Sequence, residues 1–383
     1  MQMPIQPPAA SSADRAPVLE QQVQERIRRA AASAQSPATR RAYDSAWRRF
    51  DDWCIRRGYR SLPAEPAVVA AYFVDAADTI DEQGQRCYAP ATLSKWVAAI
   101  SDRHRRHGAE AAPTQHPVVL STLAGIRREY AAAGDRPRSP RAPLLTEDVL
   151  SIVAAARAQV LGWADAVHER RDSALLLMGF AGAFRRSELV ELTGADVALH
   201  PLDGVHIHLR RSKTDQEGQG RVHALPRAED PKRCPPCAFA RWAHVVAAFD
   251  DGGRSAVIAL LSGDNSCGDD HMCQSPAQRE IRDSRAIFRA ISQNGNLSET
   301  AMSGAAVHAA IRRRAARAGF PASAVARLGA HSLRSGFVTQ AFRNGADAHA
   351  IMRQTAHRTP AMVERYAREE APLVGNAVTS LGL

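Results

Sequence analysis

Residues 329–370 read GAHSLRSGFVTQAFRNGADAHAIMRQTAHRTPAMVERYAREE, and apolar residues recur through them at the spacing of helices. The apolar positions of the first half are Leu333, Phe337, Ala341 and Phe342. Thr359 and Pro360 are typical of the N-cap and the first residue of a further helix. The stretch therefore predicts two helices joined by a connecting segment.

Both predicted helices carry polar side chains of types that take part in catalysis. His331 and Arg334 lie one turn apart at the start of the first helix. His357 comes just before the second helix, and Tyr366 lies two turns into it. An arginine binds phosphate oxygens with two parallel hydrogen bonds, a histidine holds or moves a proton near neutral pH, and a phenol can be a nucleophile.

A second motif lies upstream, in GFAGAFRRSELVELTGADV at residues 179–197. Its pattern predicts an apolar helix that ends in a glycine-containing turn and continues into RRSEL. Arg185 and Glu188 are three residues apart, which places them on one helical face. Arg186 adjoins Arg185, and only the spacing to Glu188 and Leu189 selects Arg185.

A β-hairpin is predicted between these motifs. Apolar residues alternate with polar ones at Val205, Ile207 and Leu209, and a second strand at 221–225 follows a turn of Asp, Gln, Glu and Gly. The stretch RRSKTDQEG places Lys213 just before this turn. Only three of the fifty basic residues are lysines, so a lysine inside a motif is a candidate for chemistry that an always protonated guanidinium cannot perform.

Length and composition bound the protein class. The 383 residues suggest two domains, or three, at about 150 residues each. Hydrophobic residues are 45% and charged residues 23%, which is a globular composition and excludes disordered, collagen-like and disulfide-dependent classes. The net charge of +10 favours a polyanionic partner.

Membrane and secretory signals are missing from the sequence. The longest apolar stretch, residues 174–184, is shorter than the roughly 18 residues of a spanning helix, so we expect no membrane span or membrane partner. The first 17 residues lack the basic start and apolar block of a secretory signal. The six cysteines are scattered, which suits a reducing compartment. We therefore expect the protein in the cytoplasm.

Composition and periodicity divide the chain into segments. GDRPRSPRAP, at residues 134–143, has three prolines and no periodicity, which is typical of a linker. Residues 1–35 are interpreted as a flexible arm, in which the charged run EQQVQERIRR is a candidate for a short helix. The other segments are 36–134 as a domain of four or five helices, 135–143 as a basic linker, 144–370 as a larger, mostly helical domain, and 371–383 as a mobile tail. Residues 250–282 are polar and poorly periodic, which predicts a loop insertion in the larger domain.

Two helices of the smaller domain oppose an apolar face to a basic one. The apolar positions of residues 39–59 are Tyr43, Trp47, Phe50 and Cys54, and residues 92–107 repeat the design. Candidates for contacts with a phosphate backbone, from these helices and the linker, are Arg40, Arg41, Arg48, Arg49, Lys95, Arg106, Arg138 and Arg141. The alternative for each basic face is an ordinary solvated surface.

The motifs occur in the order Arg, Glu, Lys, His-x-x-Arg, His and Tyr, and Tyr366 follows His357 by nine positions. In this order the chain resembles the tyrosine recombinases, also called phage integrases, and among them bacterial integrases whose second box runs HSLR and later IMRQT, H and ERY. The resemblance covers nearly the whole chain, from SPATRRAYDSAWRRFDDWC to ERYA.

The resemblance implies a fold. It is a two-domain, C-shaped clamp around DNA, mainly α-helical with a small β-hairpin or sheet in the catalytic domain. Residues 36–134 would be the core-binding, SAM-like domain and residues 144–370 the catalytic domain. The tail, residues 371–383, is a candidate for contact with a neighbouring protomer, and its alternative is packing on its own domain.

The resemblance also implies an activity and partners. The activity is site-specific recombination of DNA, as in integration or excision, through a 3′-phosphotyrosine and a Holliday junction. The partners are double-stranded recombination sites and further copies of the chain, as a dimer on each site and a tetramer in synapsis, with accessory proteins left open. The place of action would be the nucleoid of a bacterial cytoplasm.

The resemblance assigns catalytic roles by motif position to seven residues, which are Arg185 and Arg334 as clamp arginines, Glu188 as supporting acid, Lys213 as hairpin lysine, His331 and His357 as paired histidines, and Tyr366 as nucleophile. For Glu188 the alternative is an acid that only orients Arg185. For His357 it is a structural residue at a helix start.

Elementary chemistry agrees with these roles. The negative charge of a phosphodiester grows in the transition state, so two guanidiniums can replace a metal. A phenol is a poor nucleophile at neutral pH and needs a base, which His331 can be. An ammonium group such as that of Lys213 can give a proton to the leaving 5′-oxygen. We therefore expect no cofactor, no metal and no ATP.

Two other classes of function remain open. One is a nicking-closing enzyme that resembles type IB topoisomerases, and the other is a DNA-binding protein with a silent catalytic domain. The loss of Tyr366, Arg185 or Arg334 would have favoured the silent protein, and none of the three is lost.

A cysteine-rich motif suggests zinc as a further alternative. Cys234 and Cys237 lie in RCPPCAF, and Cys267, His271 and Cys273 follow downstream. All are residue types that bind zinc. RCPPCAF also predicts a turn into an amphipathic helix, and the downstream group is not a regular C-x-x-C, so we expect no metal there.

Overall fold

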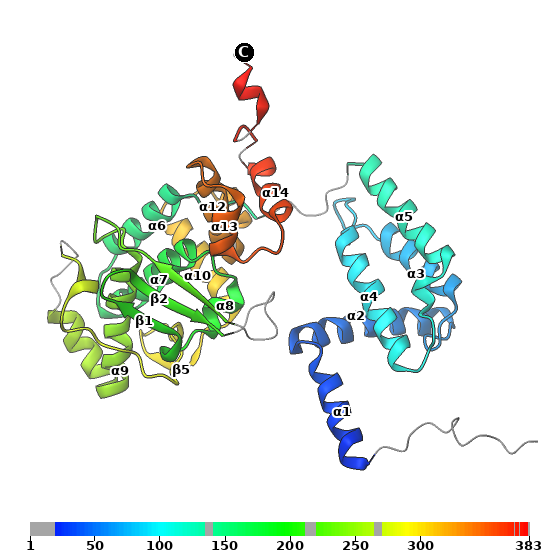
Figure 1. Ribbon diagram of the computed structural model, residues 1–383, viewed down its shortest axis with the longest axis horizontal. Helices are drawn as coiled ribbons and strands as arrows, with labels where there is room; N and C mark the ends of the chain where they lie inside the picture. Colours follow the sequence, from blue (N-terminus) through cyan, green and yellow to red (C-terminus); the bar gives the residue numbers. More distant parts are fainter. Residues whose placement is uncertain are drawn as a thin grey trace, which may run out of the picture. The chain divides into compact units, whose positions relative to one another are not determined.

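The computed structural model describes residues 20–134, 141–210, 220–263, 270–370, 372–374 and 376–381 (Figure 1). The chain divides into two compact units, residues 1–139 and 140–383, and the division falls in the segment expected to be a linker. The described residues are mostly helical with small antiparallel sheets, which confirms the predicted fold class. None of the helices described is long and apolar enough to cross a bilayer.

The first unit consists of helices, most of which begin at a proline. They are α1 (Gln21–Ser33), α2 (Pro37–Arg57), α3 (Pro66–Asp78), α4 (Pro90–Arg106) and α5 (Pro117–Ala132), with a short 3-10 helix η2 (Pro113–Gln115). Proline suits the first helical position because its fixed φ fits the helix and its missing N–H would have no partner there. Helix α1 takes up most of the charged run EQQVQERIRR, so residues 21–33 of the segment predicted as a flexible arm are helical.

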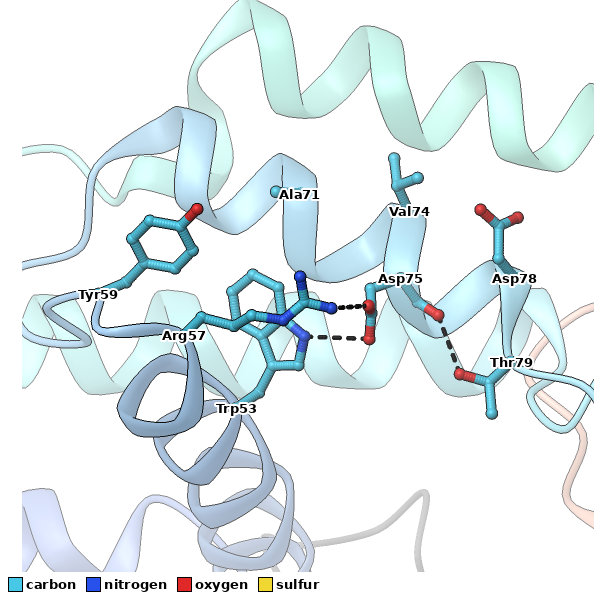
Figure 2. A pocket seen from close by; sticks show the side chains of 8 residues that line it. All are labelled: Trp53, Arg57, Tyr59, Ala71, Val74, Asp75, Asp78 and Thr79. Atoms are coloured by element: carbon cyan, nitrogen blue, oxygen red, sulfur yellow. Dashed lines mark hydrogen bonds and ion pairs between the residues drawn. The ribbon is translucent and has the colours of Figure 1, made fainter.

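Helices α2, α3 and α4 share an aromatic core in which Phe50 and Phe73 are fully buried. Asp75 on α3 accepts hydrogen bonds from Trp53 Nε1 at 3.0 Å and from Arg57 Nη2 at 2.7 Å (Figure 2). These three side chains line a shallow groove of about 550 Å³ along α2 and α3. The carboxylate thus ties the C-terminal end of α2 to α3.

The second unit carries the remaining elements. Its helices are α6 (Thr146–Ala158), α7 (Trp163–Ala181), α8 (Arg186–Glu191), α9 (Pro235–Gly263), α10 (Gly304–Arg317), α11 (Ala322–Arg327), α12 (Ala330–Arg343), α13 (Ala348–Thr355) and α14 (Pro360–Glu370). Its strands are β1 (Val197–His200), β2 (Gly204–Leu209), β3 (Arg221–Leu225), β4 (Arg289–Ile291) and β5 (Leu297–Ala301). Short 3-10 helices are η3 (Gly194–Asp196), η4 (Met272–Gln274) and η5 (Ala377–Ser380).

The predicted β-hairpin is confirmed as β2 and β3 of a three-stranded antiparallel sheet. Val205 lies opposite Leu225 and Leu209 opposite Arg221, and the apolar residues of β2 face the core. The sequence patterns missed β1, which pairs with the other edge of β2, and the separate β4–β5 hairpin.

Helix α9 extends into the segment predicted as a loop insertion, residues 250–282. Its backbone is non-helical at Gly252 and Gly253, which form a kink between two helical segments, and the second segment reaches Gly263. The prediction of a loop is wrong for residues 254–263, because the glycines break the first helical segment and a second one begins directly after them. Buried Arg289 on β4 makes two 2.7 Å bonds to the carboxylate of Asp250 and fixes this region to the β4–β5 hairpin.

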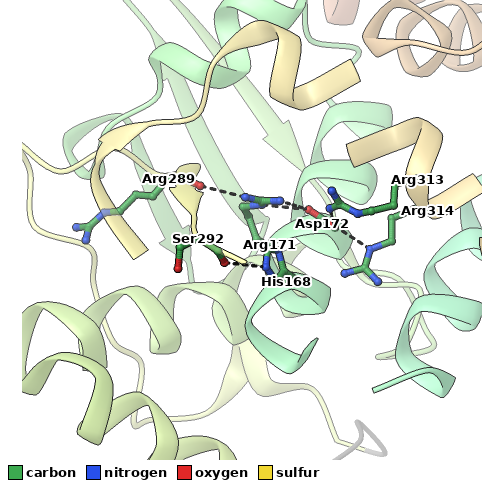
Figure 3. Close-up of polar contacts among 7 residues, drawn as sticks. All are labelled: His168, Arg171, Asp172, Arg289, Ser292, Arg313 and Arg314. Atoms are coloured by element: carbon green, nitrogen blue, oxygen red, sulfur yellow. Dashed lines mark hydrogen bonds and ion pairs between the residues drawn. The ribbon is translucent and has the colours of Figure 1, made fainter. Parts of the chain in front are cut away.

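A buried charge cluster connects α7 to α10 (Figure 3). Asp172 on α7 is 1% exposed and accepts hydrogen bonds from Arg171 at 2.7 and 3.0 Å, from Arg313 at 2.9 Å and from Arg314 at 2.8 Å. Arg171 also donates to the main-chain carbonyl of Arg289 at 3.3 Å. Removal of this carboxylate would leave three guanidiniums with no shared countercharge.

The segment after the expected linker packs against α12. The N–H of Leu144 donates to the carbonyl of Ser332 at 3.0 Å. A Cβ at Gly336 would lie 1.7 Å from the carbonyl oxygen of Leu144, so only glycine permits this approach. Arg141 donates to the carbonyl of Ala326 at 3.0 Å, which also places it on this unit.

Candidate active site

Arg334 is the most constrained side chain of the site. It lies near the start of α12 and is 3% exposed. Nη1 donates to the carbonyl of Ala183 at 2.6 Å, and Nη2 donates to that of Thr355, the last residue of α13. Burial, followed by the charge of Arg185, lowers the pKa of Arg334 to about 10, so it stays protonated at neutral pH. Segments far apart in sequence therefore hold one charged group in one orientation.

Arg185 and Glu188 contact each other across the start of α8. Arg185 is the N-cap residue with extended backbone, and its N–H donates to Glu188 Oε2 at 2.7 Å. Its Nη1 donates to Glu188 Oε1 at 2.6 Å. The predicted turn after the apolar helix is found between α7 and α8, with φ of 50° at Ala183. Arg185 lies just before α8 as its N-cap, so the three-residue spacing brings the pair together at the helix start and not along a helical face. Buried Glu188 orients Arg185, whose side chain remains 20% exposed.

The neighbouring Arg186 faces α10. A Cβ at Gly304 would lie 2.6 Å from Arg186 Nε, and burial together with the charge of Arg186 lowers the pKa of His308. The histidines of the predicted site are affected instead by Arg185. The two adjacent arginines thus point to different surroundings. Arg186 lies beside α10, and Arg185 lies in the candidate site.

His331 and Tyr366 form a hydrogen-bonded pair. The phenol oxygen of Tyr366 lies 3.0 Å from His331 Nε2. Incomplete hydration of the ring, followed by the charges of Arg334 and Arg185, lowers the pKa of His331. The imidazole is therefore neutral at physiological pH. A neutral Nε2 with a lone pair can accept the phenol proton. Three residues before Tyr366, buried Val363 packs into a small apolar cluster with Val338, Phe342 and Ile351, and this packing fixes α14 against α12 and α13.

His357 is held by the residue that ends α13. Thr355 Oγ1 donates its only hydrogen to the carbonyl of Ile351 at 2.9 Å and lies 2.7 Å from His357 Nδ1. Nδ1 therefore carries the proton, and Nε2 presents its lone pair 3.4 Å from Arg334 Nη2. Burial, followed by the charges of Arg334 and Arg185, lowers the pKa of His357 to about 4.

His223 lies beneath these groups and was missed by the sequence patterns. It is 4% exposed on β3, its ring lies 5.1 Å from that of Phe184, and neither ring nitrogen has a hydrogen-bond partner among the described residues. Burial, opposed by Glu188 and assisted by nearby arginines, lowers its pKa to about 4. A neutral His223 avoids a further positive charge under the two guanidiniums. The sequence did not indicate this position, because His223 is simply one of the polar residues that alternate along the predicted strand.

Lys213 lies outside the described residues. The structure describes the strands before and after it, β2 and β3. Arg221, the first residue of β3, donates to the carbonyls of Met352 and Arg353 at 3.3 and 3.2 Å. These carbonyls belong to α13, which ends at Thr355. The end of the hairpin that leads into the Lys213 segment is therefore fixed beside the site.

The basic residues predicted to contact a phosphate backbone are exposed wherever the structure describes them. Six lie in the first unit, which are Arg40, Arg41, Arg48, Arg49, Lys95 and Arg106. Arg49 stacks over Trp96 and donates to Tyr88 Oη at 2.8 Å, and Arg106 pairs with Asp102 at 2.9 Å. Arg141 lies on the second unit, and Arg138 lies outside the described residues.

Residues able to hold a metal gather elsewhere in the second unit. Cys234, Cys237, His271 and Cys273 place their donor atoms within 4.8 Å of one another. The sequence interpretation expected no metal, because the downstream residues lie in a polar loop and do not form a regular C-x-x-C motif. The structure brings these halves together, while Cys267 lies outside the described residues.

Comparisons with known proteins agree on one family. Residues 274–371 match the model of the phage integrase family. The chain is 30% identical over 350 residues to the integrase/recombinase xerD homolog of Selenomonas ruminantium, covering 90% of this chain and 85% of that protein.

Solved structures of such proteins are also similar to this chain. The crystal structure of XerA recombinase is 15% identical with a TM-score of 0.38, covering 94% of this chain and 99% of that one. A lambda integrase dimer bound to a COC′ core site is 17% identical with a TM-score of 0.45, covering 90% and 93%. The Tn1549 transposon integrase in complex with transposon right end DNA is 14% identical with a TM-score of 0.49, covering 92% and 98%.

Proposed function

The chain belongs to the phage integrase family of tyrosine recombinases, and on this basis we propose that it is a site-specific DNA recombinase that cleaves and rejoins strands through a 3′-phosphotyrosine. One observation supports this most directly. The phenol of Tyr366 is hydrogen-bonded to His331, on the same helix as the anchored guanidinium of Arg334.

The cleavage step follows from this geometry. The Tyr366 oxygen attacks the scissile phosphorus while its proton passes to His331 Nε2. The bond from phosphorus to the 5′-oxygen breaks, and the ammonium group of Lys213 supplies the proton that the leaving oxygen needs. A 5′-hydroxyl and a phosphotyrosine result, and a 5′-hydroxyl from a partner strand reverses the step. The covalent bond keeps the free energy of the cleaved linkage, so the cycle needs no ATP.

Two guanidiniums stabilise the charge that develops on the phosphate. Arg334 is pre-oriented by main-chain carbonyls and Arg185 by Glu188, so little reorganisation is needed when the phosphate arrives. Glu188 acts as a positioning group for Arg185. Neutral His357 lies beside Arg334, with its Nε2 lone pair 3.4 Å from Arg334 Nη2, and so helps to hold this guanidinium without adding positive charge.

The first unit supplies further contacts to duplex DNA. Its exposed basic residues on α2 and α4, together with the basic linker, match a phosphate backbone in charge. We propose that the two units clamp one duplex between them and that two protomers bind each site. Strand exchange then joins two sites in a four-protomer complex at a Holliday junction, in the bacterial cytoplasm at the nucleoid, with or without accessory proteins.

The tail contributes to these protomer contacts. Val374 packs partly against the apolar cluster of α12 to α14, while Leu373 is 63%, Val378 42% and Leu381 64% exposed. Exposed aliphatic side chains on a short terminal segment favour burial against another protein surface. An equivalent surface on the next protomer of a cyclic assembly would cover them.

The test uses a duplex with a nick next to the scissile phosphate, taken from DNA that flanks the gene. The short fragment that carries the new 5′-hydroxyl diffuses away, and the covalent adduct accumulates and survives denaturation. Peptide mapping is expected to place the DNA on Tyr366. Strand exchange between two such sites distinguishes a recombinase from the alternatives, since relaxation of plasmids without any site would indicate a nicking-closing enzyme, and binding without adduct a silent protein.

A further inference from the structure

Three cysteines and a histidine meet at the start of α9, away from the proposed active site. Cys234 directly precedes this helix and Cys237 lies in its first turn. His271 directly precedes η4 and Cys273 lies within it, more than thirty residues further along the chain. The cysteines are 0%, 3% and 4% exposed for Cys234, Cys237 and Cys273. The two pairs, which are separate in the sequence, therefore form one buried cluster in the structure.

The spacing of the donor atoms matches tetrahedral zinc. Zinc bonds of about 2.3 Å to sulfur and 2.0–2.1 Å to nitrogen give edges of about 3.8 Å between two sulfurs and about 3.6 Å between sulfur and nitrogen. Cys237 Sγ lies 3.4 Å from Cys273 Sγ and 3.3 Å from His271 Nδ1. Cys273 Sγ lies 3.9 Å from His271 Nδ1. All four donors lie within 4.8 Å of one another.

The histidine is oriented as a ligand. His271 Nε2 lies 3.1 Å from the carbonyl oxygen of Glu229, and a carbonyl only accepts, so Nε2 carries the proton. Nδ1 is then the unprotonated nitrogen, and it is the atom that faces the sulfurs. A carbonyl that fixes the tautomer of a ligating histidine is a usual feature of zinc sites. Around the sulfurs pack Ala240, Met272 and other apolar side chains, which exclude water from the group.

We propose that Cys234, Cys237, His271 and Cys273 bind one structural zinc ion. Four protein ligands and a buried environment leave no open position, which distinguishes a structural site from a catalytic one. Binding converts the three thiols to thiolates and releases their protons to solvent. The ion holds the segment around η4 against the first turn of α9.

This crosslink also reaches the hairpin that carries Lys213. Pro236 in the first turn of α9 lies 3.1 Å from where a Cβ on Gly204 would be, and Gly204 begins β2. The zinc site therefore lies at the base of the hairpin, and the opposite end lies beside α13. We expect the ion to stabilise this sheet without taking part in phosphoryl transfer.

The test measures metal on the untagged, full-length protein. We expect about one zinc per chain by mass spectrometry of the metal, and loss to background in Cys237→Ser and Cys273→Ser. Cys87→Ser, which changes a cysteine of the first unit, is the matched control and should keep its zinc. Removal of zinc by a chelator should lower the melting temperature of the wild type, and added zinc should restore it.

Cobalt identifies the ligands without any substitution, so a variant that fails to fold does not stop the test. Cobalt in the wild type should show thiolate-to-metal charge transfer and the strong visible bands of tetrahedral sites. Binding at the other candidate group, His200, Asp203 and His206, would show no thiolate band. Folded protein with negligible zinc, a cobalt spectrum without thiolate bands, or a Cys237–Cys273 disulfide in the native peptide map would each overturn the proposal.

Discussion

The phenol oxygen of Tyr366 lies 3.0 Å from Nε2 of His331 within one chain. The contact depends on α14, which is held by the burial of Val363 among residues of α12 and α13. The proposed nucleophile and the proposed base are thus paired in the protein before any DNA is bound. The phosphate that completes the site would enter beside Arg334 and Arg185.

Replacement of the phenol should separate binding from cleavage. Tyr366→Phe removes one hydroxyl, so affinity for a half-site should stay within a few fold while covalent adducts disappear. Gel mobility measures the affinity, and denaturing electrophoresis of a nicked substrate measures the adduct. Tyr59→Phe, at a half-exposed tyrosine of the first unit, is the control and should cleave normally. An adduct that persists in Tyr366→Phe would place the nucleophile elsewhere.

The role of Lys213 can be tested with a sulfur leaving group. Lys213→Arg keeps the charge but should slow cleavage of ordinary DNA severely, because a guanidinium does not release its proton readily. A bridging 5′-phosphorothiolate needs no protonation and should restore cleavage to near the wild-type rate. If both substrates show equal defects, Lys213 only binds phosphate.

Loss of the buried carboxylate should destabilise the second unit. Asp172→Asn leaves Arg171, Arg313 and Arg314 without their shared countercharge, and we expect a loss of about 3–5 kcal/mol in the free energy of unfolding. Glu299→Gln removes an exposed partner of Arg285 and should cost less than about 1 kcal/mol. Urea unfolding followed by hydrogen exchange of α7 measures both. If both variants lose the same free energy of unfolding, the buried cluster stabilises the unit no more than an exposed ion pair does.

The same carboxylate predicts a dependence on acid. Burial alone would raise the pKa of Asp172, but the guanidiniums of Arg171, Arg314 and Arg313 outweigh it and lower the pKa. Stability from this group is therefore fully present above the ordinary aspartate pKa of about 4 and is lost as pH falls through the lowered value. In Asp172→Asn this part of the acid-unfolding profile should be absent.

Buried neutral histidines predict that stability also depends on pH in a second, less acidic range. His223 and His357 have pKa values lowered to about 4, whereas an unfolded histidine titrates near 6.5. Between these limits only the unfolded chain takes up protons, so stability should fall with decreasing pH by about 1.4 kcal/mol per pH unit for each histidine.

His223 allows a clean test of this range because its nitrogens have no hydrogen-bond partner in the described chain. His223→Leu should cost little at pH 8 and should flatten the slope between pH 6.5 and 4 by the share of one histidine. An unchanged slope would mean that His223 is protonated in the folded state.

Truncation should reveal the task of the tail. Removal of the residues after Arg368 is expected to preserve binding to a single half-site and to abolish assembly of a complex with two duplexes and four protomers. Mass photometry on a full recombination site measures the assembly. Leu381→Ser, which changes a single exposed residue, should weaken cooperativity less than the truncation. Unchanged assembly by the truncated protein would show that the tail packs on its own chain.

Local sequence patterns predicted those features of the structure that depend on a single helix or hairpin. Alternation at Val205 and Ile207 predicted the hairpin, and the Thr359 and Pro360 pair predicted the start of α14 at Pro360. The motif order brought Arg185, Arg334, His331 and other site residues together without any alignment. Short β5, with Leu297 as its one buried residue, carries no alternation that a pattern could detect.

Contacts between distant segments were beyond the reach of such patterns. The carbonyls of Ala183 and Thr355 that orient Arg334 have no side-chain signature, because every residue has a carbonyl. The joining of Cys237 to Cys273 depends on the return of the chain after α9, which local spacing does not show. The spacing of Arg185 and Glu188 likewise did not show that Arg185 is the N-cap of α8 and not a residue within the helix.

The anchoring of Arg334 to two main-chain carbonyls has a consequence for the timing of activity during synthesis. Its acceptors lie before and after it in the chain, and Tyr366 must then fold back onto α12 to meet His331. Thr355 and Tyr366 are both encoded after Arg334, so a nascent chain acquires first the second carbonyl of the cradle and only then the phenol. The proposed cleavage chemistry is therefore complete only when nearly all of the second unit has been synthesised.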